Sequence, residues 1–231
     1  MKNLVVLTGA GMSADSGLST FRDSGGLWEG FDIEDVATIE GWRKNPEMVL
    51  DFYNKRRAQS ETAEPNHGHK AIADLEKFFK VQIITQNVDD LHERAGSSNV
   101  LHLHGMLREA RSSKDPEAVI NIGSGSIELG ETAEDGSQLR PNVVWFGEAV
   151  PNIEPASILV LSADILVVVG TSLVVYPAAG LINYAKEDIP KFIVDPTRPD
   201  LVHTGEWEYI AKKAAKGVPE LKRYLIEHYT E

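Results

Sequence analysis

The sequence predicts an α/β protein with a Rossmann-like parallel sheet, helices on both faces of that sheet and a small inserted lobe. Four short apolar runs indicate the strands, at residues 4–7, 81–84, 165–169 and 192–194. Each run ends in small, hydroxyl, amide or acidic residues, and helical patterns fill the stretches between the runs. Continuous apolar runs of this kind are typical of parallel strands that are covered on both faces.

Helices are expected where apolar side chains recur with helical spacing, at about residues 46–60, 67–79 and 218–229. The segment 30–64 carries no strand pattern, so we expect a helical lobe inserted over the sheet. A second insertion, 112–138, is polar and rich in glycine, which indicates a short hairpin or a mobile flap. We expect one domain, residues 1–231, with a large lobe of about 1–29, 80–105 and 143–231 and a small lobe of about 30–79 and 106–142.

Acidic side chains dominate the composition, with 35 Asp and Glu against 23 Lys and Arg and a net charge of −12 at pH 7. Such a surface repels nucleic acid and anionic membranes and favours basic protein partners. We therefore expect no nucleic-acid or membrane partner. The N-terminal residues lead directly into a core strand and the apolar runs are too short to span a bilayer, so a cytoplasmic protein is expected. The sequence leaves the oligomeric state open.

Residues 4–28 have the chemistry of a nucleotide pocket. The first strand ends in Gly9-Ala10-Gly11, which permits a tight turn and a close approach of backbone to a ligand. Residues 13–16 are expected to open a helix whose N-terminal N–H groups attract phosphate, and Arg22 places a guanidinium near this turn. Glycine is common in any turn between a strand and a helix, so the two glycines alone are weak evidence.

The carboxyl ends of all four expected strands indicate a single pocket. In an open parallel sheet, ligands bind beyond the carboxyl ends of the strands. The residues at these ends are Thr8-Gly9, Thr85-Gln86-Asn87, Gly170-Thr171-Ser172 and Asp195.

Three histidines, His92, His102 and His104, follow the second of these strand ends. If His102 and His104 lie in a strand, both face the same side, and imidazoles bind zinc, so the pair also invites a metal interpretation. No third ligand is evident, and no metal is expected. Alternatively, the segment with these three histidines could simply be part of a solvated surface.

The first motif, GAGxSxxSGxxxFR, resembles the cofactor loop of the sirtuins, the NAD-dependent protein deacylases. The second, TQNVDxLHxxAG followed by LHxHG, is similar to another sirtuin motif and lies in the order and spacing of that family. The resemblance continues through 140–148, 163–164 and 170–178, so that it covers nearly the whole chain.

The resemblance implies that the chain uses NAD, and it assigns roles residue by residue. His104 would be the general base, and Asn87 and Asp89 would hold the nicotinamide and its ribose. Gln86 would lie beside them, and Asp195 would bind the adenosine ribose at a strand end where the family pattern has asparagine. The further cofactor-binding residues that it implies are Gly9, Ala10, Gly11, Ser13, Ala14, Thr20, Phe21, Arg22, Trp28, Gly170, Thr171, Ser172 and, beside adenine, Ala214. His92 and His102 are expected to be structural or exposed.

The family mechanism implied by this resemblance consumes NAD. The acyl oxygen of a substrate lysine attacks the sugar carbon that bears nicotinamide, and a ribose hydroxyl then attacks the resulting amidate carbon. A neutral imidazole suits removal of the hydroxyl proton near physiological pH. The products would be free lysine, nicotinamide and O-acyl-ADP-ribose. The substrates would be acylated-lysine proteins, paired by strand addition with a backbone edge that includes Val144, Phe146 and Gly147.

Tyr53 and Arg56 lie three residues apart in the helix expected over 46–60, so the phenol and the guanidinium share one face. A Tyr-x-x-Arg pair at this place resembles the class III sirtuins, which remove succinyl and malonyl groups as well as acetyl. The arginine would pair with the acyl carboxylate. A solvated basic face is the alternative, because Lys55, Arg56 and Arg57 are consecutive.

One departure from the family is large. Most sirtuins carry two Cys-x-x-Cys pairs that bind a structural zinc in the small lobe, whereas this chain has no cysteine, and Ser112 stands where the first thiolate is expected. No thiolate zinc site can form, so the small lobe must be held by its own packing or be left mobile.

The expected function is that of an NAD-dependent protein-lysine deacylase acting on succinyl, malonyl and acetyl groups, with their relative preference open. The same pocket could serve a protein ADP-ribosyltransferase or an NAD hydrolase, and neither activity needs Tyr53 and Arg56. A non-catalytic NAD or ADP-ribose sensor is the alternative from another class, and it would not need a general base such as His104.

Overall fold

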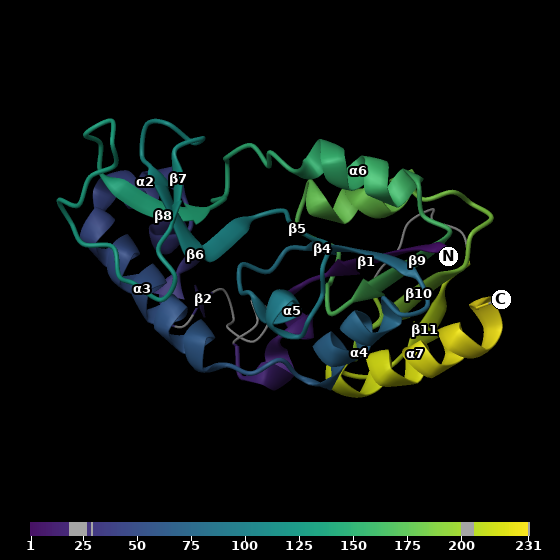
Figure 1. Cartoon of the computed structure of the whole chain (residues 1–231). Coiled ribbons are helices and arrows are strands. Elements are labelled where there is room, and N and C mark those ends of the chain that lie inside the picture. Colours follow the sequence, from purple (N-terminus) through teal and green to yellow (C-terminus); the bar gives the residue numbers. More distant parts are fainter. Residues whose placement is uncertain (19–26, 29, 200–205, 231) are drawn as a thin grey trace.

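The computed structural model describes residues 1–18, 27–28, 30–199 and 206–230, with the backbone alone at 27 and 28. A six-stranded sheet with helices on both faces forms the larger part. A smaller antiparallel sheet packs with α2 and α3 at the opposite end of the molecule, shown on the left of Figure 1.

The large sheet is parallel throughout, as the apolar runs predict. Its strands, in spatial order, are β11 (Glu208–Ile210), β10 (Lys191–Val194), β9 (Ile165–Val169), β1 (Asn3–Thr8), β4 (Lys80–Thr85) and β5 (Val100–His102). From β1 the chain first adds strands on one side and later returns to add β9 on the other. The order of addition therefore reverses between β1 and β9, and such a switch point is where ligands bind in sheets of this kind.

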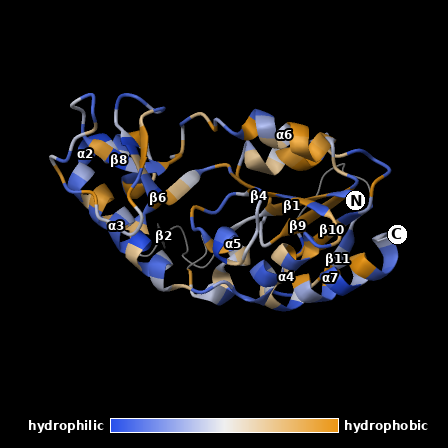
Figure 2. Cartoon of the chain, viewed as in Figure 1, coloured by the Kyte–Doolittle hydropathy of each residue, from blue (hydrophilic) through white to orange (hydrophobic). Residues whose placement is uncertain are grey.

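Two helical layers bury both faces of this sheet. Leu4 and Val6 of β1 face the core under α4 (His67–Leu75) and α7 (Ala214–Tyr229). Val5 and Leu7 face the core under α6 (Ile153–Leu161) and the 3-10 helix η3 (Ala178–Tyr184). Figure 2 shows the hydrophobic strands enclosed between these layers. Because neighbouring side chains alternate between two dry cores, the strands carry continuous apolar runs.

The small sheet contains β6 (Gly105–Ser112), β7 (Val119–Asn121) and β8 (Leu139–Val143), with β6 in the middle. The expected helical segment before it forms α1 (Ile33–Val36), α2 (Ile39–Lys44) and α3 (Pro46–Thr62), preceded by a two-residue hairpin of β2 (Leu27–Trp28) and β3 (Phe31–Asp32). Asn45 caps α3 by accepting from the N–H of Met48, and Pro46 occupies the first turn. None of the described helices is both long enough and apolar enough to cross a membrane.

Helix α4 packs on the large sheet, although the sequence suggests the small lobe for residues 67–79. Ala71, Ile72 and Leu75 belong to the core beneath α7. The spacing of these residues specifies an apolar helix face but not which core that face meets. We therefore propose that the lobe boundary lies near residue 65.

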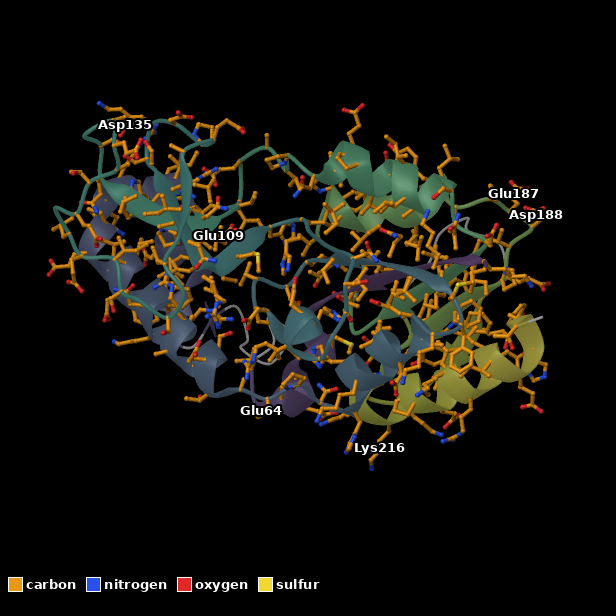
Figure 3. The ribbon with its side chains drawn as sticks, viewed as in Figure 1. Glu64, Glu109, Asp135, Glu187, Asp188 and Lys216 are labelled. Carbon is orange, nitrogen blue, oxygen red and sulfur yellow. The ribbon has the colours of Figure 1, made fainter. Side chains whose placement is uncertain are left out.

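A hydrogen-bonded cluster occupies the place where a first zinc thiolate was expected. The Ser112 hydroxyl donates to Asp135 at 2.6 Å and accepts the N–H groups of Lys114 and Asp115. Ser137 donates to the other oxygen of Asp135 through its N–H and its hydroxyl. These bonds lower the pKa of Asp135 to about 2. Figure 3 places Asp135 at the outer end of the small sheet. The small lobe also has a core of its own, formed by Leu50, Ala110, Ile127 and Leu139, and Leu139 pairs with Ser112 in the sheet.

Candidate active site

A cleft of about 550 Å³ opens at the carboxyl ends of β1, β4, β9 and β10 and reaches α3 and the segment after β8. Four expected site residues lie outside the described part of the chain, namely Thr20, Phe21, Arg22 and the side chain of Trp28. The other expected site residues all line the cleft: Gly9, Ala10, Gly11, Ser13, Ala14, Tyr53, Arg56, Gln86, Asn87, Asp89, His104, Val144, Phe146, Gly147, Gly170, Thr171, Ser172, Asp195 and Ala214.

Residues 13–16, which were expected to open a helix, do not begin an α-helix after β1. The chain instead forms two short 3-10 helices, η1 (Ala10–Met12) and η2 (Ala14–Ser16). Gly17 ends the second at a φ of 88°, a left-handed conformation that glycine adopts readily. Any attraction of phosphate to this turn must therefore come from individual N–H groups and not from the dipole of a long helix.

Glycines let the loops after β1 and β9 touch. The N–H of Gly11 donates to the carbonyl oxygen of Gly170 at 2.8 Å. A Cβ on Gly11 would lie 2.8 Å from the Cα of Gly170, and one on Gly170, where φ is 62°, would lie 2.4 Å from the nitrogen of Met12. Within the described part of the chain, the N–H groups of Ala10, Thr171 and Ser172 have no acceptor. Because these three residues line the cleft, their N–H groups suit an anionic ligand.

Ser13 joins the polar residues of the first two loops. Its hydroxyl donates to Asp89 at 3.0 Å and accepts from the Asn87 amide at 3.0 Å, while the Nε2 of His69 lies at 3.5 Å. His69 is buried, which lowers its pKa to about 4, and its Nδ1 accepts from the N–H of Asn66. The neutral ring therefore carries its proton on Nε2 and points it at Ser13. This bonding fixes the amide orientation of Asn87.

Asp89 is a buried carboxylate that lines the cleft, 7% exposed. Burial raises its pKa, while the N–H of Leu91, at the start of α5 (Leu91–Arg94), and the hydroxyl of Ser13 oppose that shift by donating to it. A carboxylate held in so little water interacts strongly with a nearby positive charge.

His104 donates from Nδ1 to the carbonyl oxygen of Gln86 at 3.0 Å, because a carbonyl can only accept. Its Nε2 is therefore the basic nitrogen of the neutral ring. Burial lowers the pKa of His104, and the bond to Gln86 only partly opposes this shift. The ring is consequently neutral at physiological pH.

His102 is buried and has both ring nitrogens engaged. Nδ1 lies 3.0 Å from the carbonyl oxygen of Asn87, and Nε2 lies 2.8 Å from a carboxylate oxygen of Glu93. Burial opposes its charged form, but the hydrogen bond and the charge of Glu93 outweigh burial and raise the pKa of His102. Neither nitrogen is available to a metal, and no group of three potential ligands for a metal ion occurs among the residues that the structure describes.

At the other end of the cleft lie Tyr53 and Arg56, on the buried side of α3. Burial raises the pKa of Tyr53 to about 12, and its oxygen accepts from the indole N–H of Trp145 at 3.0 Å. The solvated basic face considered from the sequence does not occur, since Arg56 is 7% and Arg57 only 2% exposed. Of the three consecutive basic residues, Lys55 alone faces solvent.

The backbone edge expected to bind the substrate is partly used within the chain. Val144 and Phe146 donate their N–H groups to the carbonyl oxygens of His104 and Ala37. The N–H of Trp145 donates to Glu148. Phe146 also forms a parallel bridge with Thr38, so a strand added here would pair with the backbone of the neighbouring residues, such as Val144 and Gly147.

Sequence reasoning assigned no role to Glu148, Tyr176 and Lys213, which also line the cleft, and it used Trp145 only as part of the backbone edge 144–147. Trp145 and Glu148 lie in the block 140–148, which was noted for its likeness to the family. Neither residue type is diagnostic of a role at that position. The signals that identify them are the contact of Trp145 with Tyr53 and that of Glu148 with the Trp145 N–H, and only the structure provides these.

Comparisons with known proteins agree with this architecture. The Sir2 family pattern matches residues 9–177. The chain is 53% identical over 232 residues to an NAD-dependent protein deacylase of Bacteroides thetaiotaomicron, which covers 98% of this chain and 99% of that protein. An ADP-ribose complex of a mutant Sir2 homologue superposes with a TM-score of 0.89 at 39% identity, covering 98% of this chain and 92% of the other. A Sir2 homologue bound to NAD gives 0.87 at 39% identity, covering 98% and 90%. With the family pattern, the switch-point cleft and near full-length similarity in agreement, the chain belongs to the Sir2 family.

Proposed function

We propose that this Sir2 family protein is an NAD-dependent protein-lysine deacylase whose acyl channel accepts succinyl and malonyl groups as well as acetyl. One observation carries the acyl class: a buried guanidinium, Arg56, and a buried phenol, Tyr53, line the cleft that also contains His104 and Asp89. A cationic group in a nearly dry channel favours an anionic ligand, because the desolvated charge gains most from an opposite charge.

The described residues at the switch point suit NAD. The N–H groups of Ala10, Thr171 and Ser172 would bind the pyrophosphate. Asp195 directly follows β10 and is 2% exposed. One of its oxygens accepts from the N–H of Thr197 at 2.8 Å, and a carboxylate at this strand end is an acceptor suited to the hydroxyls of the adenosine ribose. When bound, NAD supplies the sugar carbon that the acyl oxygen attacks, together with nicotinamide as the leaving group.

Asn87 and Asp89 would act where positive charge develops on that sugar. Since the amide nitrogen of Asn87 is held by Ser13, its carbonyl oxygen can face the ligand. The buried carboxylate of Asp89 would stabilise the cationic sugar electrostatically, in a site that excludes most water. Ser13 orients both side chains at once.

His104 would take the proton of a ribose hydroxyl. The bond from Nδ1 to Gln86 leaves Nε2 as the proton acceptor, and burial keeps the ring neutral. Asp89 and His104 thus have separate tasks, electrostatic stabilisation and proton transfer.

Tyr53 and Arg56 would bind the far end of the acyl group. Arg56 would pair with the carboxylate of a succinyl or malonyl chain, and Tyr53, protonated over the physiological range, would donate a second hydrogen bond. An acetyl group lacks this carboxylate and would use the same channel without that interaction.

The test measures nicotinamide release with matched succinyl-lysine, acetyl-lysine and unmodified peptides. We expect release to require an acyl peptide and to be abolished by His104→Ala but not by His67→Ala, which changes an exposed histidine. Arg56→Met should lower kcat/KM for the succinyl peptide by about one to two orders of magnitude, the scale of a hydrogen bond to a charged group. Lys55→Met, the solvent-facing neighbour, is the matched control and should leave the ratio of succinyl to acetyl turnover unchanged.

Two results would overturn the proposal. Nicotinamide release at the same rate without an acyl peptide would indicate NAD hydrolysis or ADP-ribosyl transfer. NAD binding without release would indicate a sensor.

A further inference from the structure

Trp145 connects the proposed acyl channel to a buried group of charges. Its indole N–H donates to the phenol oxygen of Tyr53 at 3.0 Å, and the two rings lie 6.4 Å apart. Both side chains are nearly or fully inaccessible to solvent, and both residues line the cleft with Arg56. The bond therefore lies in a place where water cannot substitute for either partner.

The direction of this hydrogen bond is fixed by chemistry. An indole N–H can only donate, so the Tyr53 oxygen must accept. A phenol has one proton of its own, and burial raises the pKa of Tyr53 to about 12, so that proton is retained. Among the residues that the structure describes, no acceptor for it is found.

The position of Trp145 is itself fixed by contacts with Glu148 and Arg140. Glu148 accepts the backbone N–H of Trp145 at 2.8 Å, and the guanidinium of Arg140 stacks 3.3 Å from the centre of the indole. Arg140 in turn donates twice to Glu148, at 2.7 and 3.1 Å, and Arg111 donates to the same carboxylate. The ring cannot rotate without leaving the Arg140 guanidinium on its face and breaking the indole bond to Tyr53, and the bond to Glu148 holds the backbone at this residue.

We propose that Trp145 is a positioning residue for acyl selection, which directs the Tyr53 proton into the channel by occupying an acceptor site on the phenol oxygen. The proton is then presented to the carboxylate of a succinyl or malonyl group beside Arg56. An acetyl group ends in a methyl and gains nothing from this donor. The inference rests on the proposed function and concerns the ratio of acidic to neutral acyl turnover.

The test is a double-mutant cycle between Trp145→Phe and Tyr53→Phe, measured as the ratio of kcat/KM for succinyl-lysine to that for acetyl-lysine. Both substrates are assayed on one preparation, so a loss of folded protein cancels from the ratio. We expect each single variant to lower the ratio by about tenfold, the scale of one hydrogen bond to a carboxylate. The change should lie mainly in KM for the succinyl peptide, because the contact is present in both the ground and the transition state.

In the Tyr53→Phe background, Trp145→Phe should have no further effect on the ratio, because no phenol proton remains to be positioned. An equal fall in both backgrounds would show that Trp145 acts through packing and would overturn the inference. An unchanged ratio in the single Trp145→Phe variant would also overturn it.

A second replacement protects the test against a folding defect in Trp145→Phe. Benzothienylalanine introduced at position 145 keeps the fused-ring shape but has no N–H, and it should lower the ratio as Trp145→Phe does. A ratio like that of the wild type with this side chain would contradict the inference. If the wild type shows no succinyl turnover, or if Arg56→Met leaves the ratio unchanged, the proposed function fails and the inference fails with it. A normal response to Arg56→Met with no response at Trp145 would overturn the inference alone.

Discussion

The Nδ1 of His104 lies 3.0 Å from the carbonyl oxygen of Gln86, and this contact determines which nitrogen of the ring is basic. Two residues earlier, His102 makes the same kind of contact to the carbonyl of Asn87. His102, the last residue of β5, and His104 thus hold two successive peptide groups of the loop after β4 that carries Asn87 and Asp89. The loop at the proposed nicotinamide site is oriented through its backbone as well as through its side chains.

The first prediction concerns the pH dependence set by His104. Burial lowers its pKa, so the neutral, basic form persists to a pH below the ordinary histidine value of about 6.5. We expect kcat/KM for an acyl peptide to be flat near neutral pH and to fall as the pH drops through this lowered pKa. A pH profile from about 5 to 8 checks the position of the acid limb.

In the same profile, His104→Ala should lower kcat/KM by about 10²-fold or more near neutral pH, the usual scale for a general base, and the difference should shrink as the pH falls through the lowered pKa of His104. An acid limb centred well above pH 6.5 would contradict the assignment of His104. So would substantial activity in the alanine variant.

The second prediction concerns the ion pair between His102 and Glu93. The pKa of His102 is raised in the folded protein, so the stabilisation from this pair is complete below its unfolded pKa and is lost as the pH rises through the folded value. Glu93→Gln should therefore reduce the free energy of unfolding most near pH 6 and progressively less at higher pH. Denaturant unfolding of both proteins at several pH values measures this difference, and a difference independent of pH would rule out the linkage.

Much of the fold was predictable because its causes are local. Strands buried on both faces must be apolar throughout, which made β1, β4, β9 and β10 visible as runs. Residues at the carboxyl ends of parallel strands meet at one edge, which brought Asn87, Thr171 and Asp195 to one cleft. The motifs supplied the rest of the candidate site.

Other features depend on contacts between distant segments, which spacing does not reveal. Trp145 and Tyr53 are 92 positions apart, and neither residue type indicates that the two side chains form a hydrogen bond. An apolar helix face does not say whether α4 packs on the large sheet or in the small lobe. Without a cysteine at 112, the sequence did not distinguish a small lobe held by its own packing from a mobile one. The hydrogen bond from Ser112 to Asp135 joins residues 23 positions apart, and the sequence gives no sign of it.

The third prediction concerns Asp195, where the family pattern has asparagine. Asp195→Asn keeps an oxygen for the N–H of Thr197 but replaces the second carboxylate oxygen by a donor. We expect a rise of a few-fold in KM for NAD with little change in kcat, because the adenosine end takes no part in bond breaking. Asp195→Ala also removes the acceptor for Thr197 and should raise KM by about tenfold. Initial rates at varied NAD concentration distinguish these outcomes, and an unchanged KM in both variants would place the adenosine ribose elsewhere.

The fourth prediction concerns the hydrogen-bonded cluster that stands at the expected zinc position. Ser112→Ala removes the acceptor of the N–H groups of Lys114 and Asp115, two exposed residues, so it should lower the free energy of unfolding by about 0.5–1.5 kcal/mol, the net scale of a hydrogen bond. The pKa of Asp135 is lowered to about 2 in the folded protein, so its contribution is complete above the unfolded carboxyl pKa and is lost as the pH falls toward 2. The stability difference between the wild type and Asp135→Asn should therefore be constant at neutral pH and shrink below about pH 4.

A chelator tests whether the cluster of Ser112 and Asp135 binds a metal ion. Because the chain has no cysteine, chelation should leave both the unfolding midpoint and nicotinamide release unchanged. If chelation lowered the midpoint of the wild type but not that of Ser112→Ala or Asp135→Asn, a metal bound at this cluster would be responsible. The small lobe would then be held by oxygen ligands, and the hydrogen bonds of Ser112 and Asp135 would describe only its metal-free form.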